Sequence, residues 1–328
     1  MTRLYTKLEK ITINYLSKKK ALKEYNKNKK KTFFGEVFSW LDALLFAVVV
    51  VILLNQFIFQ LFVIPTPSMV STLNVQDRVL VSKLSYGIEP YPTGDKFFTT
   101  NRKVQADDII CFYNPMYDSK GPLFDVLSQF IYYGTLGLVN IDRKEDGSVA
   151  ERLYVKRAAA VSGDHLKFEN GVSYIKPVGY STYFNEEEWK ANNDYNTEFN
   201  KTLDSQYYEG LTAWASLYAM QENSINITMH PYYKEYNEME EQKVRDNYTF
   251  DKQRSHFNAL INPLDKQALS DAAIYEYGIY VPQNHILPLG DNRDNSHDGR
   301  YFGPVNQSEI IGKVTTTFWP LNRFRNFL

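Results

Sequence analysis

Two residues stand where they could form a nucleophile and its base. Ser68 lies in the segment IPTPSMVSTL, which begins at Ile64 and places two prolines just before the serine. A serine hydroxyl is a weak nucleophile without a base, and a lysine can be that base if burial keeps its amine neutral. Lys156 lies in the apolar segment LYVKRAAAV, where strand alternation would direct Arg157 to the opposite face. The pattern therefore admits a Ser-Lys dyad, although such a lysine is more often a surface residue of an amphipathic strand.

Other chemistries fit the sequence less well. The chain has five histidines, but it contains no His-Glu-x-x-His motif, no Cys-x-x-Cys pair and no phosphate loop, so we expect no metal site and no cofactor. The consecutive residues Ser296, His297 and Asp298 do not suggest a triad, because the members of a triad converge from separated segments. On a strand, Ser296 and Asp298 would share one face.

A long apolar run without charge precedes the serine. It reads ALLFAVVVVILLNQFIFQLFVI from Ala43 to Ile64. As a helix it would extend about 33 Å, against ~30 Å for the hydrocarbon core of a bilayer. The run is too long for the core of a signal peptide, and no Ala-x-Ala site follows it. We therefore expect an uncleaved membrane anchor.

Charge is distributed unevenly along the 328-residue chain. The totals of 37 Lys+Arg and 38 Asp+Glu give no indication of a nucleic-acid partner. Residues 1–33, however, carry eleven basic and only two acidic side chains. By the positive-inside rule this segment stays in the cytoplasm, and everything after Ile64 lies outside. The single cysteine, Cys111, excludes an intrachain disulfide and is expected to be a small buried hydrophobe.

The part of the chain beyond the anchor alternates short β-like runs with turn signals such as Asn114-Pro115 and Asn170-Gly171. We expect a mainly β, antiparallel domain with an α/β insertion and one N-terminal transmembrane helix. The apolar segment 123–140 is expected to be a short helix or a surface loop that touches lipid. The expected division is a basic cytoplasmic segment (1–36), a transmembrane anchor (37–64), a core in two parts (65–176 and 279–328) and an insertion rich in Tyr, Asn and Glu (177–278).

Four segments resemble, in order, the sequence boxes of type I (bacterial leader) signal peptidases. They are IPTPSMVSTLNVQDRVLVSKLSYG, ADDIICFYNP, YVKRAAAVSGD and LPLGDNRDNSHDGRYFGPV. Together they span roughly residues 65–165 and 279–318, and the insertion lies where the family often carries a variable second domain. The resemblance implies an antiparallel β catalytic domain of the signal-peptidase type. It also implies a Ser-Lys endopeptidase that removes signal peptides from exported preproteins.

The resemblance also implies roles for individual residues. Ser68 would be the nucleophile and Lys156 the general base. Thr66 and the Ser68 amide would form the oxyanion hole, and Ser296 would orient the lysine amine by a hydrogen bond. Four polar residues would support the site, namely Asp298 and Arg300 as an ion pair, together with Arg157 and Asp291. The positions that line the substrate pocket carry bulky apolar residues that would leave room only for small residues before the cut, namely Phe62, Ile64, Met69, Leu73, Tyr154 and Val155.

The sequence departs from the family pattern in several places. Pro67 stands where many members have glycine, Asp107 replaces the usual glycine before Asp108, and Gly299 replaces the second serine of the last box. Further departures are Ser71, Ala160 and Ser162. None of them removes a proposed catalytic group, but Pro67 and Gly299 border the site and could alter its geometry.

The expected partners are the signal peptides of exported preproteins and membrane lipid, with contact to the secretion machinery as a further expectation. The expected location is the inner (cytoplasmic) membrane, spanned once, with the catalytic domain on the outer (periplasmic) side. Two alternatives stay open. One is a related Ser-Lys peptidase with a dedicated substrate, such as a conjugation pilin, and the other is a non-enzymatic anchored binding module that uses the insertion as its contact surface.

Overall fold

The computed structural model describes residues 2–28, 33–89, 94–100, 102–135, 139–144, 147–193, 195, 197–240 and 245–327. Part of the basic N-terminal segment and part of the insertion lie outside the described residues. The chain forms two compact units, Met1–Ile52 and Leu53–Leu328.

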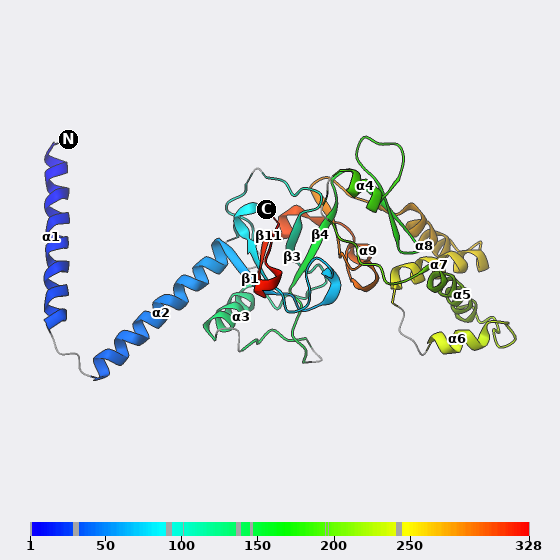
Figure 1. Cartoon of the computed structure of the whole chain (residues 1–328), viewed down its shortest axis with the longest axis horizontal. Coiled ribbons are helices and arrows are strands. Elements are labelled where there is room, and N and C mark those ends of the chain that lie inside the picture. The colour runs from blue at the N-terminus through cyan, green and yellow to red at the C-terminus, as the bar shows by residue number, and fades with distance from the viewer. Residues whose placement is uncertain are drawn as a thin grey trace. The chain divides into compact units, whose positions relative to one another are not determined.

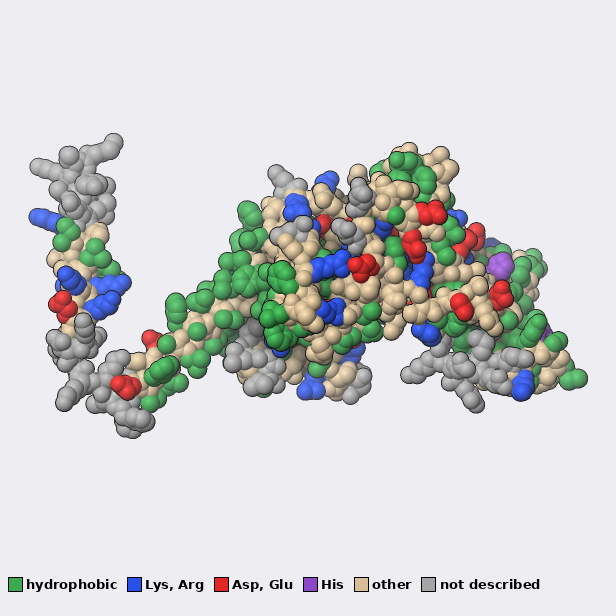
Figure 2. Space-filling view, viewed as in Figure 1, with side chains coloured by type: hydrophobic (Ala, Val, Ile, Leu, Met, Phe, Trp, Pro, Cys, Tyr) green, Lys and Arg blue, Asp and Glu red, His purple; other side chains and the backbone are tan. Residues whose placement is uncertain are grey.

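The N-terminal part of the chain consists of two helices, α1 (Thr2–Asn28) and α2 (Phe33–Phe57). In the described part of the chain, the stretch Glu36–Phe57 of α2 is the one helix long and apolar enough to cross a membrane. Large apolar side chains such as Phe38, Trp40 and Phe46 are exposed along it, and Figure 2 shows hydrophobic side chains covering α2. A helix that is apolar all round and not buried in protein fits a membrane anchor.

The apolar run does not form one helix up to Ile64, so this expectation is wrong for its last residues. The helix α2 ends at Phe57, and strand β1 (Phe59–Val63) follows it. β1 pairs antiparallel with β2 (Arg78–Ser82), with Phe62 opposite Val79. This pairing gives the backbone of β1 its hydrogen bonds, and the prolines that follow could not continue a helix.

An antiparallel sheet forms the centre of the second unit (Figure 1). Its strand order is β1, β2, β11 (Ile310–Trp319), β3 (Ile109–Tyr113), β4 (Leu153–Val161), β9 (His285–Leu289) and β10 (Val305–Asn306), and β12 (Arg325–Asn326) pairs with β11. This architecture confirms the expected fold class. Because β4 lies beside β9, the strand that carries Lys156 is next to the strand that leads into the last box.

The hydrophobic core along this sheet contains residues that are far apart in the sequence. Met69, Val81, Cys111 and Val314 are buried in one cluster. Burial raises the pKa of the Cys111 thiol to about 12, which agrees with the expected role of a small buried hydrophobe. The helices α3 (Pro122–Gly134) and α9 (Gly299–Phe302) lie in the connections between strands.

A smaller sheet and a group of helices accompany the large sheet, and the insertion supplies the helices and one strand of the smaller sheet. The sheet has the order β7 (Phe184–Asn185), β6 (Val172–Lys176), β5 (His165–Glu169) and β8 (Ile279–Tyr280). The helices are α4 (Glu186–Asn192), α5 (Ser205–Glu222), α6 (Tyr233–Glu240), α7 (Asn247–Ile261) and α8 (Lys266–Tyr277). The side chains of Asp204, Asp246 and Asp265 cap α5, α7 and α8 by accepting backbone N–H groups. Because β6 pairs with β7, the small sheet crosses the expected boundary between residues 176 and 177.

Candidate active site

Ser68 lies in a single turn of 3-10 helix, Pro67–Met69, directly after β1. The fixed φ of Pro67 suits the first position of such a turn. The last box holds the backbone of this turn in place, because the N–H of Asn292 donates to the carbonyl oxygen of Ser68 (3.1 Å) and its side-chain amide donates to that of Pro67 (3.0 Å). The backbone of Ser68 is therefore fixed relative to the last box, and the residue is buried.

Lys156 lies on β4 and is only 4% exposed. Burial lowers the pKa of its amine to about 8, although the nearby carboxylate of Asp298 acts in the opposite direction. The amine lies 5.6 Å from the centre of the Tyr154 ring. A lysine in such a place loses its proton much more readily than one in water, which is the property that a general base needs.

Ser68 and Lys156 line the same cavity, which has a volume of about 380 Å³. Five of the six expected pocket residues line it as well, namely Phe62, Ile64, Met69, Tyr154 and Val155. Leu73 is not among the lining residues and is fully buried in the hydrophobic core with Val79 and Val81. The cavity is therefore lined by apolar side chains together with the hydroxyl of Ser68 and the amine of Lys156.

Some lining residues were not expected from the sequence. Glu151, Leu153, Asn295 and His297 also line the cavity. The signal for two of them was present, because Asn295 and His297 lie in the last box beside Ser296. The signal for Leu153 and Glu151 was the two-residue strand period, because they lie one and two repeats before Val155.

The hydroxyl groups around Ser68 are closely placed. The Oγ1 atom of Thr66 lies 3.3 Å from the Oγ atom of Ser68. Ser296 Oγ is buried and has no hydrogen-bond partner in the described part of the chain, so the expected bond to the Lys156 amine is not formed here. A Cβ atom on Gly290 would lie 2.2 Å from Ser296 Oγ and 2.5 Å from the Ser68 carbonyl oxygen. Only glycine allows the last box to approach the serine turn so closely.

The expected bracing ion pair is formed. Arg300 Nε donates to Asp298 Oδ1 (2.9 Å), and the backbone N–H of Gly290 donates to Asp298 Oδ2 (3.0 Å). The departure at Gly299 has a steric reason, since a Cβ atom there would lie 2.7 Å from the Leu287 side chain and 2.8 Å from a backbone oxygen. The serine of the family pattern would not fit at this position without a shift of β9.

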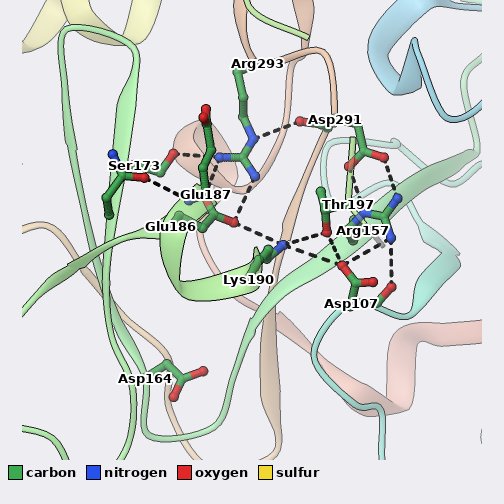
Figure 3. A network of polar contacts seen from close by, with 12 residues as sticks. Asp107, Arg157, Asp164, Ser173, Glu186, Glu187, Lys190, Thr197, Asp291 and Arg293 are labelled. Atoms are coloured by element: carbon green, nitrogen blue, oxygen red, sulfur yellow. Dashed lines mark hydrogen bonds and ion pairs between the residues drawn. The ribbon is translucent and has the colours of Figure 1, made fainter. Parts of the chain in front are cut away.

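A second ion pair joins the strand of Lys156 to the last box. Arg157 donates two hydrogen bonds to the carboxylate of Asp291, at 2.8 and 2.6 Å, and Thr72 donates a third at 2.6 Å. Figure 3 shows Arg157 and Asp291 facing one another within a larger polar network. Such a bidentate pair fixes geometry as well as charge. The pair of Arg157 and Asp291 thus holds β4 against the last box, whereas the pair of Asp298 and Arg300 braces the last box internally.

A buried serine and a buried lysine on one cavity, held by an antiparallel sheet, define the site of a serine peptidase. The model of the family "Signal peptidase, peptidase S26" matches residues 37–319. The chain therefore belongs to this family and is an enzyme, a peptidase of the class that removes signal peptides.

Known relatives agree with this assignment. A signal peptidase I of Buchnera aphidicola subsp. Schizaphis graminum is 27% identical over 322 residues, covering 95% of this chain and 86% of the relative. A signal peptidase I of Helicobacter pylori (strain 26695) is 23% identical over 300 residues, covering 88% and 85%. A signal peptidase I of Leptolyngbya laminosa is 42% identical over 67 residues, covering 20% and 33%. The alternative of a non-enzymatic binding module does not agree with this membership.

Proposed function

We propose that this chain is a membrane-anchored signal peptidase that cleaves exported preproteins with a dyad of Ser68 and Lys156. The observation that carries the proposal is that both side chains are buried on one cavity, while burial lowers the pKa of the lysine to about 8. At neutral pH a useful fraction of such an amine is neutral and able to accept a proton.

The proposed reaction proceeds through an acyl-enzyme. Neutral Lys156 takes the proton of Ser68 Oγ while that oxygen forms a bond to the carbonyl carbon at the cut site. The carbonyl oxygen becomes an oxyanion, to which Thr66 Oγ1 and the Ser68 backbone N–H donate. Lys156 then returns its proton to the leaving amine as the C–N bond breaks. In the second half, Lys156 takes a proton from a water molecule whose oxygen attacks the ester carbon. Lys156 then gives this proton to Ser68 Oγ as the ester C–O bond breaks, which releases the free serine.

The apolar wall of the cavity supports a preference for small side chains before the cut. Phe62, Ile64, Met69 and Val155 occupy much of the space beside the nucleophile. A bulky side chain at the cut site would have to displace one of these well-packed residues, which is costly in a close-packed protein. We propose that alanine-sized residues of signal peptides bind here.

Lipid contact is proposed for α3 in addition to the anchor α2. The polarity of α3 is inverted, because Asp125 and Ser128 are buried whereas Leu123 is 84% and Phe130 58% exposed. Arg152 bonds both inward-facing side chains, at 2.9 and 3.0 Å. A helix that directs its polar groups inward and its apolar groups outward is suited to the bilayer interface.

We propose that the N-terminus is cytoplasmic and that the catalytic unit lies on the outer side of the inner membrane, where exported preproteins emerge. The basic residues of the N-terminal segment support this orientation. Contact with the secretion machinery would bring preproteins to the site. A related peptidase with a dedicated substrate, such as a pilin, is the second candidate, and the range of preproteins cleaved distinguishes the two.

The test uses the full-length protein in detergent with a purified preprotein. Ser68→Ala and Lys156→Ala should each abolish cleavage, whereas Ser71→Ala and Lys167→Ala, which change nearby residues outside the cavity, should not. Cleavage by Lys156→Ala at the wild-type rate would refute the dyad. Cleavage of one pilin-like substrate but of no general preprotein would favour the dedicated peptidase.

A further inference from the structure

Asp107 has a backbone conformation that normally belongs to glycine. Its φ is +75°, in the left-handed region that a residue with a β-carbon adopts only at a cost. It also stands where the family usually has glycine. The backbone is therefore strained at this position, and contacts made by the Asp107 carboxylate can offset the free-energy cost of that strain.

The Asp107 carboxylate receives groups from two different parts of the chain. Arg157 of the catalytic sheet lies 3.2 Å away, and its Nη1 atom also donates to the Asp107 carbonyl oxygen (3.0 Å). From the insertion, Lys190 of α4 lies 3.7 Å away, and the hydroxyl of Thr197 donates to the same carboxylate oxygen. Asp107 thus joins the strand of Lys156 to the insertion.

A second connection runs from α4 to the last box. Glu186 pairs with Lys190 (3.1 Å) and with Arg293 (3.0 Å), and Arg293 Nε donates to the carbonyl oxygen of Gly290 (3.0 Å). The backbone N–H of Asn200 donates to the carbonyl oxygen of Asp291 (3.0 Å). The insertion is therefore bonded directly to the segment that contacts the Ser68 turn.

These residues form one buried network, seen from close by in Figure 3. It contains three acidic side chains, Asp107, Glu186 and Asp291, and three basic ones, Arg157, Lys190 and Arg293. Five of the six are at most 3% exposed, and Asp107 is 15% exposed at its side chain. The charges alternate and balance, so that removing one leaves a partner uncompensated.

The network is joined to both halves of the dyad. On the lysine side, Arg157 directly follows Lys156 on β4. On the serine side, Asp291 lies between Gly290 and Asn292, and both of these residues lie close to the Ser68 carbonyl oxygen. Glu186, Lys190 and Asp107 touch neither the cavity nor the reacting atoms. Any effect that they have on the reaction must act through Arg157 and Asp291.

We propose that the insertion residues Glu186, Lys190, Thr197 and Asn200 form a brace that positions Ser68 relative to Lys156. Asp107 is the positioning residue that couples this brace to Arg157. This inference rests on the proposed function. It assigns to the insertion a part in catalysis rather than only a part in substrate or partner binding. A small displacement of reacting groups has a large effect on rate, so a loosened brace should lower kcat more than it changes KM.

Asp107→Gly is the decisive variant, because glycine relieves the strained backbone and removes only the carboxylate. The matched control is Asn284→Gly, which changes an exposed residue with φ +60° that lies outside the cavity. Full-length wild-type and variant proteins in detergent are compared for kcat, KM and melting temperature with one preprotein. For Asp107→Gly we expect kcat to fall on the order of 10-fold to 100-fold, with KM close to wild type and a melting temperature that is lowered but stays above the assay temperature. We expect no change in kcat for Asn284→Gly.

Folded Asp107→Gly with the kcat of the wild type would overturn the inference and leave the network as a contact that only docks the insertion. If Asp107→Gly melts below the assay temperature, Asp107→Asn decides in its place. Asparagine tolerates the left-handed conformation and keeps an acceptor for Thr197, but it lacks the charge that pairs with Arg157 and Lys190. Wild-type protein that cleaves no preprotein would instead overturn the proposed function, and the positioning role with it.

Discussion

The hydroxyl oxygen of Thr66 lies 3.3 Å from that of Ser68, on the extended residue that precedes the serine turn. In the proposed reaction, in which Ser68 attacks a carbonyl, the developing oxyanion would form within reach of both residues. Thr66→Val keeps the shape of the side chain and removes its donor. We expect kcat to fall about 10²–10³-fold with little change in KM, measured by single-substrate kinetics on a preprotein.

Thr66→Ser is the control for this prediction, because it keeps the hydroxyl and should retain most of the activity. Wild-type kcat in Thr66→Val would show that the hydroxyl makes no contribution to the transition state.

The pH dependence of cleavage should report the Lys156 amine. Burial lowers the pKa of Lys156 to about 8, and in the proposed mechanism the neutral amine is the active form. The value of kcat/KM should therefore rise about tenfold per pH unit below the pKa and level off above it. Glu151 raises the pKa of Lys156, so Glu151→Gln should shift the profile to lower pH. A profile that is flat between pH 6 and pH 10 would argue against lysine as the base.

The ion pair of Asp298 and Arg300 should matter for stability. Burial alone would raise the pKa of the fully buried Asp298 carboxyl, but Arg300 outweighs it and the pKa is lowered. Asp298→Asn leaves Arg300 without its charged partner and should cost about 3–5 kcal/mol of unfolding free energy, measured by denaturant titration in detergent. Asp118→Asn, at an exposed position, is the matched control and should have little effect.

The Asp298 carboxyl should also make the free energy of unfolding depend on pH in the acid range. Because the pKa of the Asp298 carboxyl is lower in the folded state, the unfolded state binds more protons as the pH falls toward and below the ordinary aspartate pKa of 3.8. The stabilisation is fully present above that value and is lost as the pH falls through the folded pKa. In Asp298→Asn this part of the acid dependence should be missing, and an unchanged dependence would contradict the assignment.

The inverted polarity of α3 predicts contact with lipid. Cys111 is the only cysteine and is buried, so Leu127→Cys, on the exposed face of α3, provides a single site for an environment-sensitive fluorophore. In nanodiscs, spin-labelled lipids should quench this label. A label at Val178→Cys, which is 66% exposed and lies in the insertion, should stay unquenched. Equal quenching of the two, or none, would refute the lipid contact.

The orientation in the membrane can also be tested with added cysteines, because the native Cys111 is buried. Ser17→Cys in α1 and Val178→Cys in the catalytic unit are both exposed. In intact spheroplasts, a membrane-impermeant maleimide should label the residue at 178 and leave the one at 17 unlabelled until the membrane is opened. The reverse pattern would place the catalytic unit in the cytoplasm.

Much of the site could be predicted from the sequence, because its candidate residues lie in short segments that neighbouring residues make recognisable. The strand pattern around Lys156 and the apolar run before Ser68 each depend on neighbours in the chain. The boundary between helix and strand in that run could not be predicted. An apolar segment suits either element, and the pairing of Phe62 with Val79 on another strand decides between them.

The sequence by itself determined the class of the chain and which residues could be nucleophile, base and supporting ion pairs. Only the tertiary structure decided why Gly290 and Gly299 must lack a side chain, why Leu73 belongs to the core, and what the carboxylate of Asp107 contacts. These properties depend on the approach of segments that lie tens to hundreds of residues apart, and no local pattern encodes such distances. The departure at Asp107 therefore has a reason only in the folded chain, where its carboxylate meets both Arg157 and Lys190.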